Sequence, residues 1–302
     1  MTDPRLTEQR NPRSRRVDRL TSLEIVDLVN AEDRSIPEAV GRERDSIARA
    51  IDLVVDAFRS GGRLIYVGAG TSGRLGVLDA AEMPPTFGTD PELVQGVIAG
   101  GYEALVSARE GAEDREGEGM AAMDERRVGP SDVVLGIATS GTTPYVHGAL
   151  GRARERGART GLLLCTPPSP ELTALCDVVI APLVGPEVIT GSTRMKAGTA
   201  TKLVLNTITT GAMVRTGKVF GNLMVDLRVN SRKLRDRAER ILMETLGIGR
   251  ADAGDLLDRA EGHVKTALVM GAHGIDRTEA RRRLEEAEGV LARIIDEPKA
   301  GS

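Results

Sequence analysis

Small hydroxyl and glycine residues gather at three points where an apolar run gives way to a helical pattern. The first stretch, "GAGTSG", holds Gly70, Thr71 and Ser72; the second, "ATSGTTP", holds Ser140, Gly141, Thr142 and Thr143; the third, "TGSTRMK", holds Ser192, Thr193 and Lys196. Backbone N–H groups and the dipole at a helix N-terminus attract anions. Serine and threonine are also common helix caps, which explains any one loop alone. Their recurrence in three loops predicts a shared phosphate site.

The first loop also matches G-x-G-x-x-G, the spacing of a dinucleotide-binding turn. In that fold the second strand ends in an acidic residue that holds the ribose, but here the corresponding run ends "VIAGG". The lysine of an NTP-binding P-loop is also missing. A phosphomonoester on a small polar molecule fits these loops better than NAD or an NTP.

Three glutamates are candidates for proton transfer or substrate contact. Glu82 stands before Pro84-Pro85, which we expect to end its helix. A carboxyl group there faces the negative end of the helix dipole, which favours the protonated form and suits a general acid. Glu113 lies in the acidic segment "REGAEDREGEG", most of which should be a solvated face. Glu187 precedes the third loop, where it contacts substrate, caps a helix or pairs with an arginine.

Short apolar runs that alternate with helical segments must position these residues. We expect strands at 63–68, 94–100, 132–138, 160–166 and 177–183, followed by a long helix from about Thr193 to Thr216. This order is typical of an α/β, doubly wound five-stranded parallel sheet, whose ligands bind beyond the carboxyl ends of the strands.

Helical patterns flank this sheet region on both sides. Two capping boxes, Thr21-x-x-Glu24 and Ser35-x-x-Glu38, precede an apolar stripe that ends at Gly61-Gly62. Beyond about residue 245 the pattern is helical only, with one helix opened by Asp276-x-x-Glu279. We expect N-terminal helices over residues 1–60, a sugar-phosphate-binding domain over 61–225 and a C-terminal helical region over 226–302.

The composition narrows the class of protein. The 302 residues carry a net charge of −3, include no Trp and only three Tyr and three Phe, and so favour neither nucleic acid nor stacked aromatic ligands. We expect the Arg-rich start, "RNPRSRRVDR", to be a solvated arm. Two cysteines, three scattered histidines and no long apolar run point to a cytoplasmic protein without a metal site or membrane span.

Long motifs identify a family resemblance. The strings "TEQRNP", "GAGTSGRLGVLDAAEMPPTFG", "TPYVHGAL", "VGPEVITGSTRMKAGTATKLVLN" and "GKVFGNLMVDL" closely resemble the N-acetylmuramic acid 6-phosphate etherases of the sugar isomerase (SIS) superfamily. The resemblance runs from about Thr7 to the end of the chain. It implies a cytoplasmic lyase of peptidoglycan amino-sugar recycling, which releases D-lactate and N-acetylglucosamine 6-phosphate by elimination followed by addition of water.

The resemblance also implies roles for individual residues. The family's catalytic glutamates fall on Glu82, assigned as the acid, and Glu113, assigned as the base, and no metal or redox cofactor is needed. Ser72, Ser140 and Ser192 with their neighbours should hold the 6-phosphate, with Arg74 and Arg194 adding charge or forming surface ion pairs. Glu187 and Lys196 belong to the same candidate site.

Two positions depart from the family pattern. Thr142 stands where the family usually has arginine, which puts one contact to an anionic part of the substrate in doubt. Met83 stands where cysteine is common, a difference that we expect to affect packing alone. The resemblance further implies a homodimer with sites near the subunit interface and a ubiquitin-associated-like C-terminal bundle.

Three other functions remain open from the sequence. The glucokinase regulatory protein, a relative of the etherases, binds sugar phosphates without this catalysis. A sugar-phosphate isomerase of the same fold would rearrange the carbonyl without releasing lactate. A NAD-dependent enzyme is the third.

Overall fold

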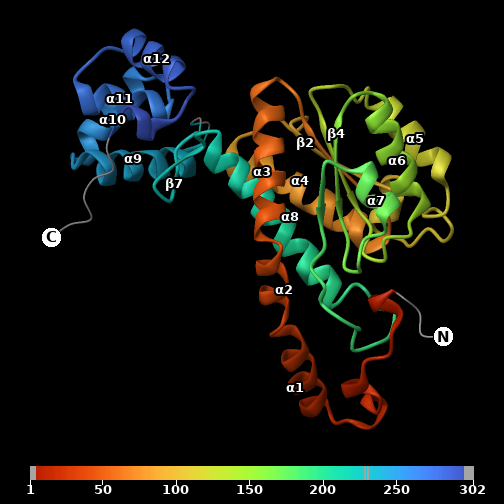
Figure 1. Ribbon diagram of the computed structural model, residues 1–302. Coiled ribbons are helices and arrows are strands. Elements are labelled where there is room, and N and C mark those ends of the chain that lie inside the picture. The colour runs from red at the N-terminus through yellow and green to blue at the C-terminus, as the bar shows by residue number, and fades with distance from the viewer. Residues whose placement is uncertain (1–4, 228, 230, 296–302) are drawn as a thin grey trace. The chain divides into compact units, whose positions relative to one another are not determined.

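The computed structural model describes residues 5–227, 229 and 231–295 (Figure 1). Within them the chain forms two compact units. The first is built from the chain up to Met83 and from Asp90 to Thr210, and the second from Pro84–Thr89 and from Gly211 onward. The domain boundary predicted near residue 225 remains a prediction.

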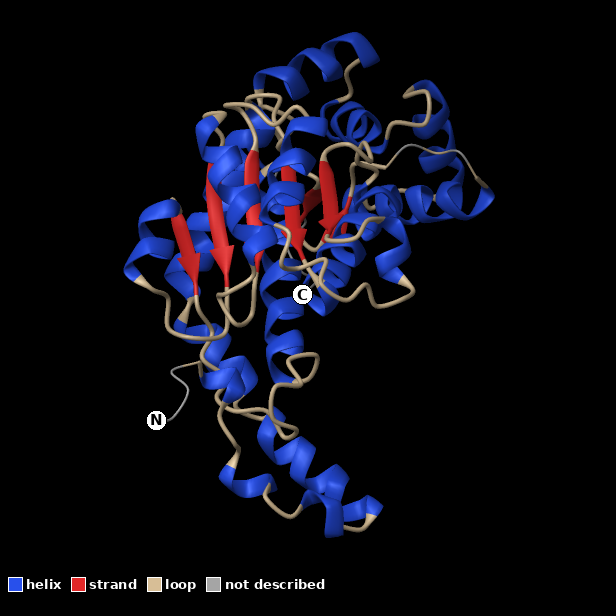
Figure 2. Ribbon diagram, turned by 90° about the vertical axis from the view of Figure 1, so that its right-hand side faces the viewer, coloured by secondary structure: helices blue, strands red, loops and turns tan. Residues whose placement is uncertain are grey.

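The first unit contains the parallel sheet. Its strands are β1 (Leu64–Gly68), β2 (Val94–Ile98), β3 (Val133–Ile137), β4 (Arg159–Leu163) and β5 (Val178–Ile180), in the order β2-β1-β3-β4-β5. All five strand arrows point the same way in Figure 2. The predicted doubly wound sheet is therefore confirmed, with each strand within one or two residues of its expected start.

Helices cover both faces of this sheet. The described helices of the first unit, including two that continue into the second, are α1 (Ser22–Asp33), α2 (Ile36–Arg42), α3 (Arg44–Arg59), α4 (Gly70–Phe87), α5 (Glu116–Glu125), α6 (Pro144–Glu155), α7 (Pro170–Leu175) and α8 (Lys196–Arg215). Figure 1 shows α5 and α6 on one side of the sheet and α3, α4 and α8 on the other.

The sheet face under α5 and α6 holds the main core. Odd-numbered residues of β1, such as Ile65 and Val67, pack there against Met123 and Val146. Even-numbered Tyr66 points to the opposite face, where its hydroxyl donates to Asp79 Oδ2 of α4 at 2.9 Å. Burial raises the pKa of Asp79, and hydrogen bonds from Tyr66 and Thr209 partly offset this effect.

The second unit is mainly helical. It contains a short antiparallel pair, β6 (Val219–Phe220) and β7 (Leu223–Met224), which the sequence analysis did not anticipate. The pair is followed by α9 (Arg232–Leu246), α10 (Arg250–Arg259), α11 (Val264–His273) and α12 (Arg277–Glu286). The expected cap of α12 is present, because Asp276 accepts from the Glu279 N–H at 2.9 Å. Within the described ranges, no helix combines the length and apolar character that crossing a bilayer requires.

Of the two capping boxes predicted for the N-terminal helices, one is confirmed and one is wrong. The capping box at Thr21 is confirmed, with both reciprocal hydrogen bonds to Glu24. The box predicted at Ser35 is wrong. The Ser35 hydroxyl donates to the Glu32 carbonyl at 2.9 Å, which closes the end of α1 instead of capping α2.

The contact between α5 and α6 depends on glycines. A Cβ on Gly148 would lie 2.3 Å from the Glu116 carbonyl oxygen, and one on Gly119 would lie 1.9 Å from the Tyr145 carbonyl oxygen. The two helix backbones therefore touch directly, and this contact fixes the start of α5 beside the start of α6.

We predict that Gly148→Ala lowers the free energy of unfolding by about 1–3 kcal/mol, because the added methyl group must push the helices apart. Gly151 of α6 has open space around its Cβ position and is the matched control. Gly151→Ala should raise the free energy of unfolding by up to about 1 kcal/mol through helix propensity. Urea unfolding measures both, and equal effects would contradict the proposed contact.

Candidate active site

The first hydroxyl loop is shaped by close glycine packing between β1 and α4. A Cβ on Gly73 would lie 2.7 Å from the Gly68 carbonyl oxygen and 2.6 Å from Ile98. Gly70 has φ of +52°, a value that favours glycine. The glycine spacing therefore lets the helix begin against the strand ends, with Thr71 and Ser72 in its first turn. This packing explains G-x-G-x-x-G without a dinucleotide.

The second hydroxyl loop emerges beside the first. The register pairs Gly68 with Ile137, so β1 and β3 end level with each other. In the loop that follows β3, the Ser140 and Thr142 hydroxyl oxygens lie 3.0 Å apart. Thr143 stands at the N-cap of α6 but its side chain makes no capping hydrogen bond. Capping therefore does not account for the hydroxyl of Thr143.

The third loop reaches the first through the start of α8. A Cβ on Gly198 would lie 3.6 Å from Thr71 Cγ2. However, α8 begins at Lys196, not at Thr193 as predicted, and its first N–H groups already have acceptors. Those of Lys196 and Ala197 donate to the two carboxylate oxygens of Glu187, at 3.0 and 2.9 Å. An anion at this loop would have to be held by the Ser192 and Thr193 hydroxyls.

Glu187 and Lys196, both predicted to contact substrate, are engaged in the protein interior. Glu187 is fully buried, and burial raises its pKa while the two N–H donors partly offset that rise. The Lys196 ammonium group, also buried, lies 2.7 Å from Glu32 Oε2. These contacts support a role in fixing the third loop. Direct contact of either residue with substrate stays a prediction.

The N-terminal arm completes this arrangement. Asn11 Nδ2 donates to Glu32 Oε2 at 2.8 Å and to the Pro186 carbonyl at 3.2 Å. The Gly191 N–H donates to the Thr7 carbonyl at 3.1 Å. The expectation that "RNPRSRRVDR" is a solvated arm is wrong in part, since Asn11 and Ser14 within it are buried. No spacing rule could have found these partners, which lie far apart in the sequence.

Glu113 lies next to the second loop. Its backbone carbonyl accepts from the Tyr145 N–H, in the first turn of α6, at 3.0 Å. Its side chain is exposed. The structure therefore brings Glu113 to the same end of β3 as Ser140 and Thr142, with its carboxylate facing solvent.

Glu82 occupies a different position from the one expected. It is exposed on α4, which continues through Pro84 and Pro85 to Phe87. The prediction that the prolines end the helix is wrong. Because proline has no N–H, the carbonyls of Ala80 and Ala81 nevertheless lack their helical donors. Glu82 therefore lies near two carbonyls to which Pro84 and Pro85 cannot donate, and it does not stand at the last turn of the helix.

The two arginines of the first and third loops have different surroundings. Arg74 donates to the carbonyls of Leu105 and Ala104, at 3.0 and 2.7 Å, and so fastens the segment after β2 instead of forming a surface ion pair. Arg194 is exposed. Among the described residues, no group of His, Cys, Asp and Glu is arranged to hold a metal ion.

Comparisons with known proteins decide the family. The model of the glucokinase regulatory protein N-terminal SIS domain matches residues 46–154. An N-acetylmuramic acid 6-phosphate etherase from Trichormus variabilis is 53% identical over 290 residues, which cover 96% of this chain and 94% of that protein. A second, from Rhodopirellula baltica, is 51% identical and covers 97% of this chain and 96% of its own. The chain belongs to the N-acetylmuramic acid 6-phosphate etherase family.

Similarity to solved structures is lower. The phosphoheptose isomerase from Neisseria gonorrhoeae is 19% identical, and the match covers 64% of this chain and 99% of that one with a TM-score of 0.48. For the etherase family, the resemblance found in the sequence motifs is confirmed over nearly the whole chain.

We predict that Glu32→Gln lowers the free energy of unfolding by about 3–5 kcal/mol, because it leaves the buried Lys196 ammonium group without its carboxylate. Asp45→Asn is the control, since the Asp45–Arg44 pair is exposed on α3. Its effect should stay below about 1 kcal/mol. Urea unfolding at neutral pH separates the two, and similar effects would contradict the role given to the buried pair.

The contribution of the Glu32–Lys196 pair to stability should also depend on pH. Burial raises the pKa of Glu32, but hydrogen bonds from Lys196 and Asn11 and the charge of Lys196 lower it on balance. A lowered pKa stabilises the folded state above the unfolded value of about 4.3 and loses this contribution as the pH falls through the folded value. The stability difference between wild type and Glu32→Gln should therefore shrink below about pH 4.

Proposed function

We propose that this etherase cleaves the D-lactyl ether of N-acetylmuramic acid 6-phosphate with Glu82 as acid and Glu113 as base. The observation that carries the proposal is the 53% identity, over 96% of the chain, to a protein named for this activity. The products are N-acetylglucosamine 6-phosphate and D-lactate. We place the reaction in peptidoglycan recycling in the cytoplasm. Cys165 and Cys176 form no disulfide, which is consistent with a reducing compartment.

The elimination requires two proton transfers, and the addition of water requires two more, because the water molecule gives up one proton to a carboxylate and C2 takes one. With the sugar ring open, C2 lies next to an aldehyde, which makes the C2 proton acidic. Glu113 takes that proton while Glu82 protonates the lactyl oxygen, and the C3–O bond breaks with its electrons on the departing lactate. Water then adds to C3 of the unsaturated aldehyde, and a proton returns to C2. Atoms and electrons balance without an oxidant.

The phosphate is assigned to the edge where the three loops meet. The first turn of α4 offers backbone N–H groups and the Ser72 hydroxyl, and the second loop adds Ser140, Thr142 and Thr143. Ser192 and Thr193 contribute hydroxyls, since Glu187 already occupies the N–H groups at the start of α8. Thr142 is short and neutral where the family pattern described above has arginine, so this loop would bind phosphate by hydrogen bonds without that positive charge.

The position of Glu82 supports a homodimer. It lies ten residues after Ser72 in one helix, which corresponds to about 15 Å along the axis. From phosphorus to the ether oxygen a hexose 6-phosphate spans less than about 10 Å at ordinary bond lengths. A substrate held at the first turn of α4 is therefore better served by Glu82 of a second subunit. The proposal accordingly combines Glu113 and the loops of one subunit with Glu82 of its partner.

A sugar-phosphate-binding regulator is the second candidate. The observation that favours it is the match of residues 46–154 to the glucokinase regulatory protein model. Both functions use the same phosphate loops. They differ in that a regulator binds the sugar phosphate without releasing lactate.

We predict that Glu82→Gln and Glu113→Gln both abolish D-lactate release, but differ in deuterated water. Without its acid, Glu82→Gln should still exchange the C2 proton for deuterium, because the base remains. Glu113→Gln should do neither. A coupled lactate dehydrogenase assay and NMR of the sugar measure the two steps. Glu110→Gln, an exposed neighbour of Glu113, is the control and should remain active.

Lactate release at the wild-type rate by Glu82→Gln would refute its assignment as the acid. Exchange at C2 by Glu113→Gln would refute the assignment of the base. Tight binding of the sugar phosphate by wild type, with neither lactate release nor exchange, would favour the regulator.

We predict that mixing subunits restores activity. In a dimer of one Glu82→Gln and one Glu113→Gln subunit, a shared site leaves one site intact and places both changes in the other. Differently tagged, co-expressed and purified heterodimers should therefore recover about half of wild-type lactate release, as expected for independent sites. If each site belongs to a single chain, every site carries one defect and the heterodimer stays inactive.

A further inference from the structure

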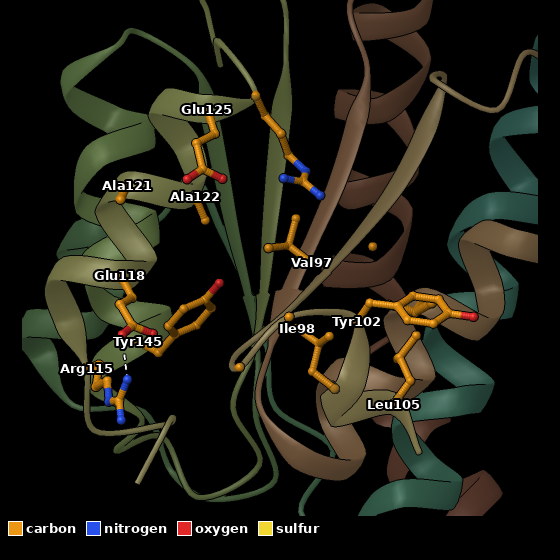
Figure 3. Close-up of a pocket in the computed structure, with 15 residues that line it drawn as sticks. Val97, Ile98, Tyr102, Leu105, Arg115, Glu118, Ala121, Ala122, Glu125 and Tyr145 are labelled. Atoms are coloured by element: carbon orange, nitrogen blue, oxygen red, sulfur yellow. Dashed lines mark hydrogen bonds and ion pairs between the residues drawn. The ribbon is translucent and has the colours of Figure 1, made fainter. Parts of the chain in front are cut away.

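A pocket of about 670 Å³ lies at the edge of the sheet, beside the segment that carries Glu113. It is lined by β2, which is the first strand of the sheet order, by α5 and by the segment after β2. None of the predicted catalytic or phosphate-binding residues lines it. Figure 3 shows Glu118, Ala122 and Glu125 along α5 on one side and Tyr102 and Leu105 on the other, with Val97 and Ile98 between them.

Arg126 is one of two arginines that line this pocket, with Arg115. Its Nε is buried and has no hydrogen-bond partner within the described chain. Its backbone is held firmly, because the Arg126 carbonyl accepts from Arg63 Nη2 at 3.0 Å. Solvent does not reach this Nε, so a ligand in the pocket would contact the guanidinium group at its terminal nitrogens.

Tyr145 supplies a second donor. Its side chain is buried, and burial raises its pKa, so that the hydroxyl keeps its proton at neutral pH. Arg126, Glu118 and Glu125 line the same pocket as Tyr145. In Figure 3 the Tyr145 ring projects from α6 into the pocket.

The remaining charges decide what the pocket accepts. Arg115 pairs with Glu118 at 2.7 Å, whereas Glu125 is exposed at the rim. Arg115 and Arg126 balance Glu118 and Glu125, so the lining has no net charge. A phosphate dianion in the pocket would be repelled by the carboxylates of Glu118 and Glu125, and Arg126 alone would attract it, since Arg115 is paired with Glu118. A carboxylate needs only one charge and fits the planar fork of a single guanidinium group.

We propose that this pocket binds a small hydroxy- or aminocarboxylate. Arg126 and Tyr145 donate to its carboxylate, and Glu125 accepts from its hydroxyl or ammonium group. Val77, Val97 and Leu105 cover its short carbon body. The pocket is lined by none of the residues assigned to the etherase reaction, and the proposal does not depend on that reaction.

D-Lactate is a suitable probe of this class, and its binding to the full chain can be titrated by ligand-observed NMR. Arg126→Gln should weaken binding at least about tenfold, because it removes the charged guanidinium donor to the carboxylate. Ala121→Phe should weaken it as much by filling the pocket from an exposed position on α5. Arg154→Gln, an exposed arginine on α6 outside the pocket, is the control and should bind as wild type does.

Inorganic phosphate tests the class of ligand. An equal concentration should leave bound D-lactate in place, and displacement would overturn the assignment to carboxylates. Absence of D-lactate binding to wild type, or equal binding by wild type and Ala121→Phe, would overturn the site even if Arg126→Gln failed to fold. Arg126→Gln and Ala121→Phe should both retain lactate release from the sugar phosphate. Loss of the etherase activity from every protein would refute the proposed function while leaving this binding pattern intact.

Discussion

The buried ion pair between Lys196 and Glu32 is the interaction on which the candidate active site depends. It joins the first turn of α8 to α1, and Asn11 brings the N-terminal arm to the same carboxylate. Removing either charged side chain from this pair would leave the other buried without a partner of opposite charge. The third loop, the arm and two helices are therefore fixed together. A loop rich in glycine and hydroxyl residues gains a defined shape from contacts that lie outside it.

The glycine contacts provide the complementary constraint on the other two loops. Gly73 presses the start of α4 against Gly68, and Gly148 presses α6 against α5. The first contact sets the hydroxyls of the first loop at the end of β1, and the second sets Glu113 beside the second loop. A phosphate site assembled from neutral donors requires such rigid backbones, because hydrogen bonds lose strength quickly as distances and angles depart from their optimum.

The sequence predicted the parts of this molecule that follow from local pattern. The five strands, the cap at Thr21 and the hydroxyl loops at strand ends all rest on periodicity or on the needs of a helix terminus. The partners of Asn11, Glu32 and Lys196 rest on tertiary contacts between distant segments, which no local spacing encodes. At Ser35 and Pro84 the local rule was outweighed. The Ser35 hydroxyl donates to the Glu32 carbonyl instead of capping α2, and α4 continues through Pro84 and Pro85.

The continuation of α4 changes the argument about Glu82. A helix that ended at Met83 would place this carboxyl group against the full negative end of the dipole. The longer helix moves the end of the dipole to Phe87, and within it Pro84 and Pro85 offer no N–H to the Ala80 and Ala81 carbonyls. The helix end that suggested Glu82 as the acid is therefore not beside it in the structure. Glu82 instead stands exposed on the side of a helix, where its carboxyl group is accessible.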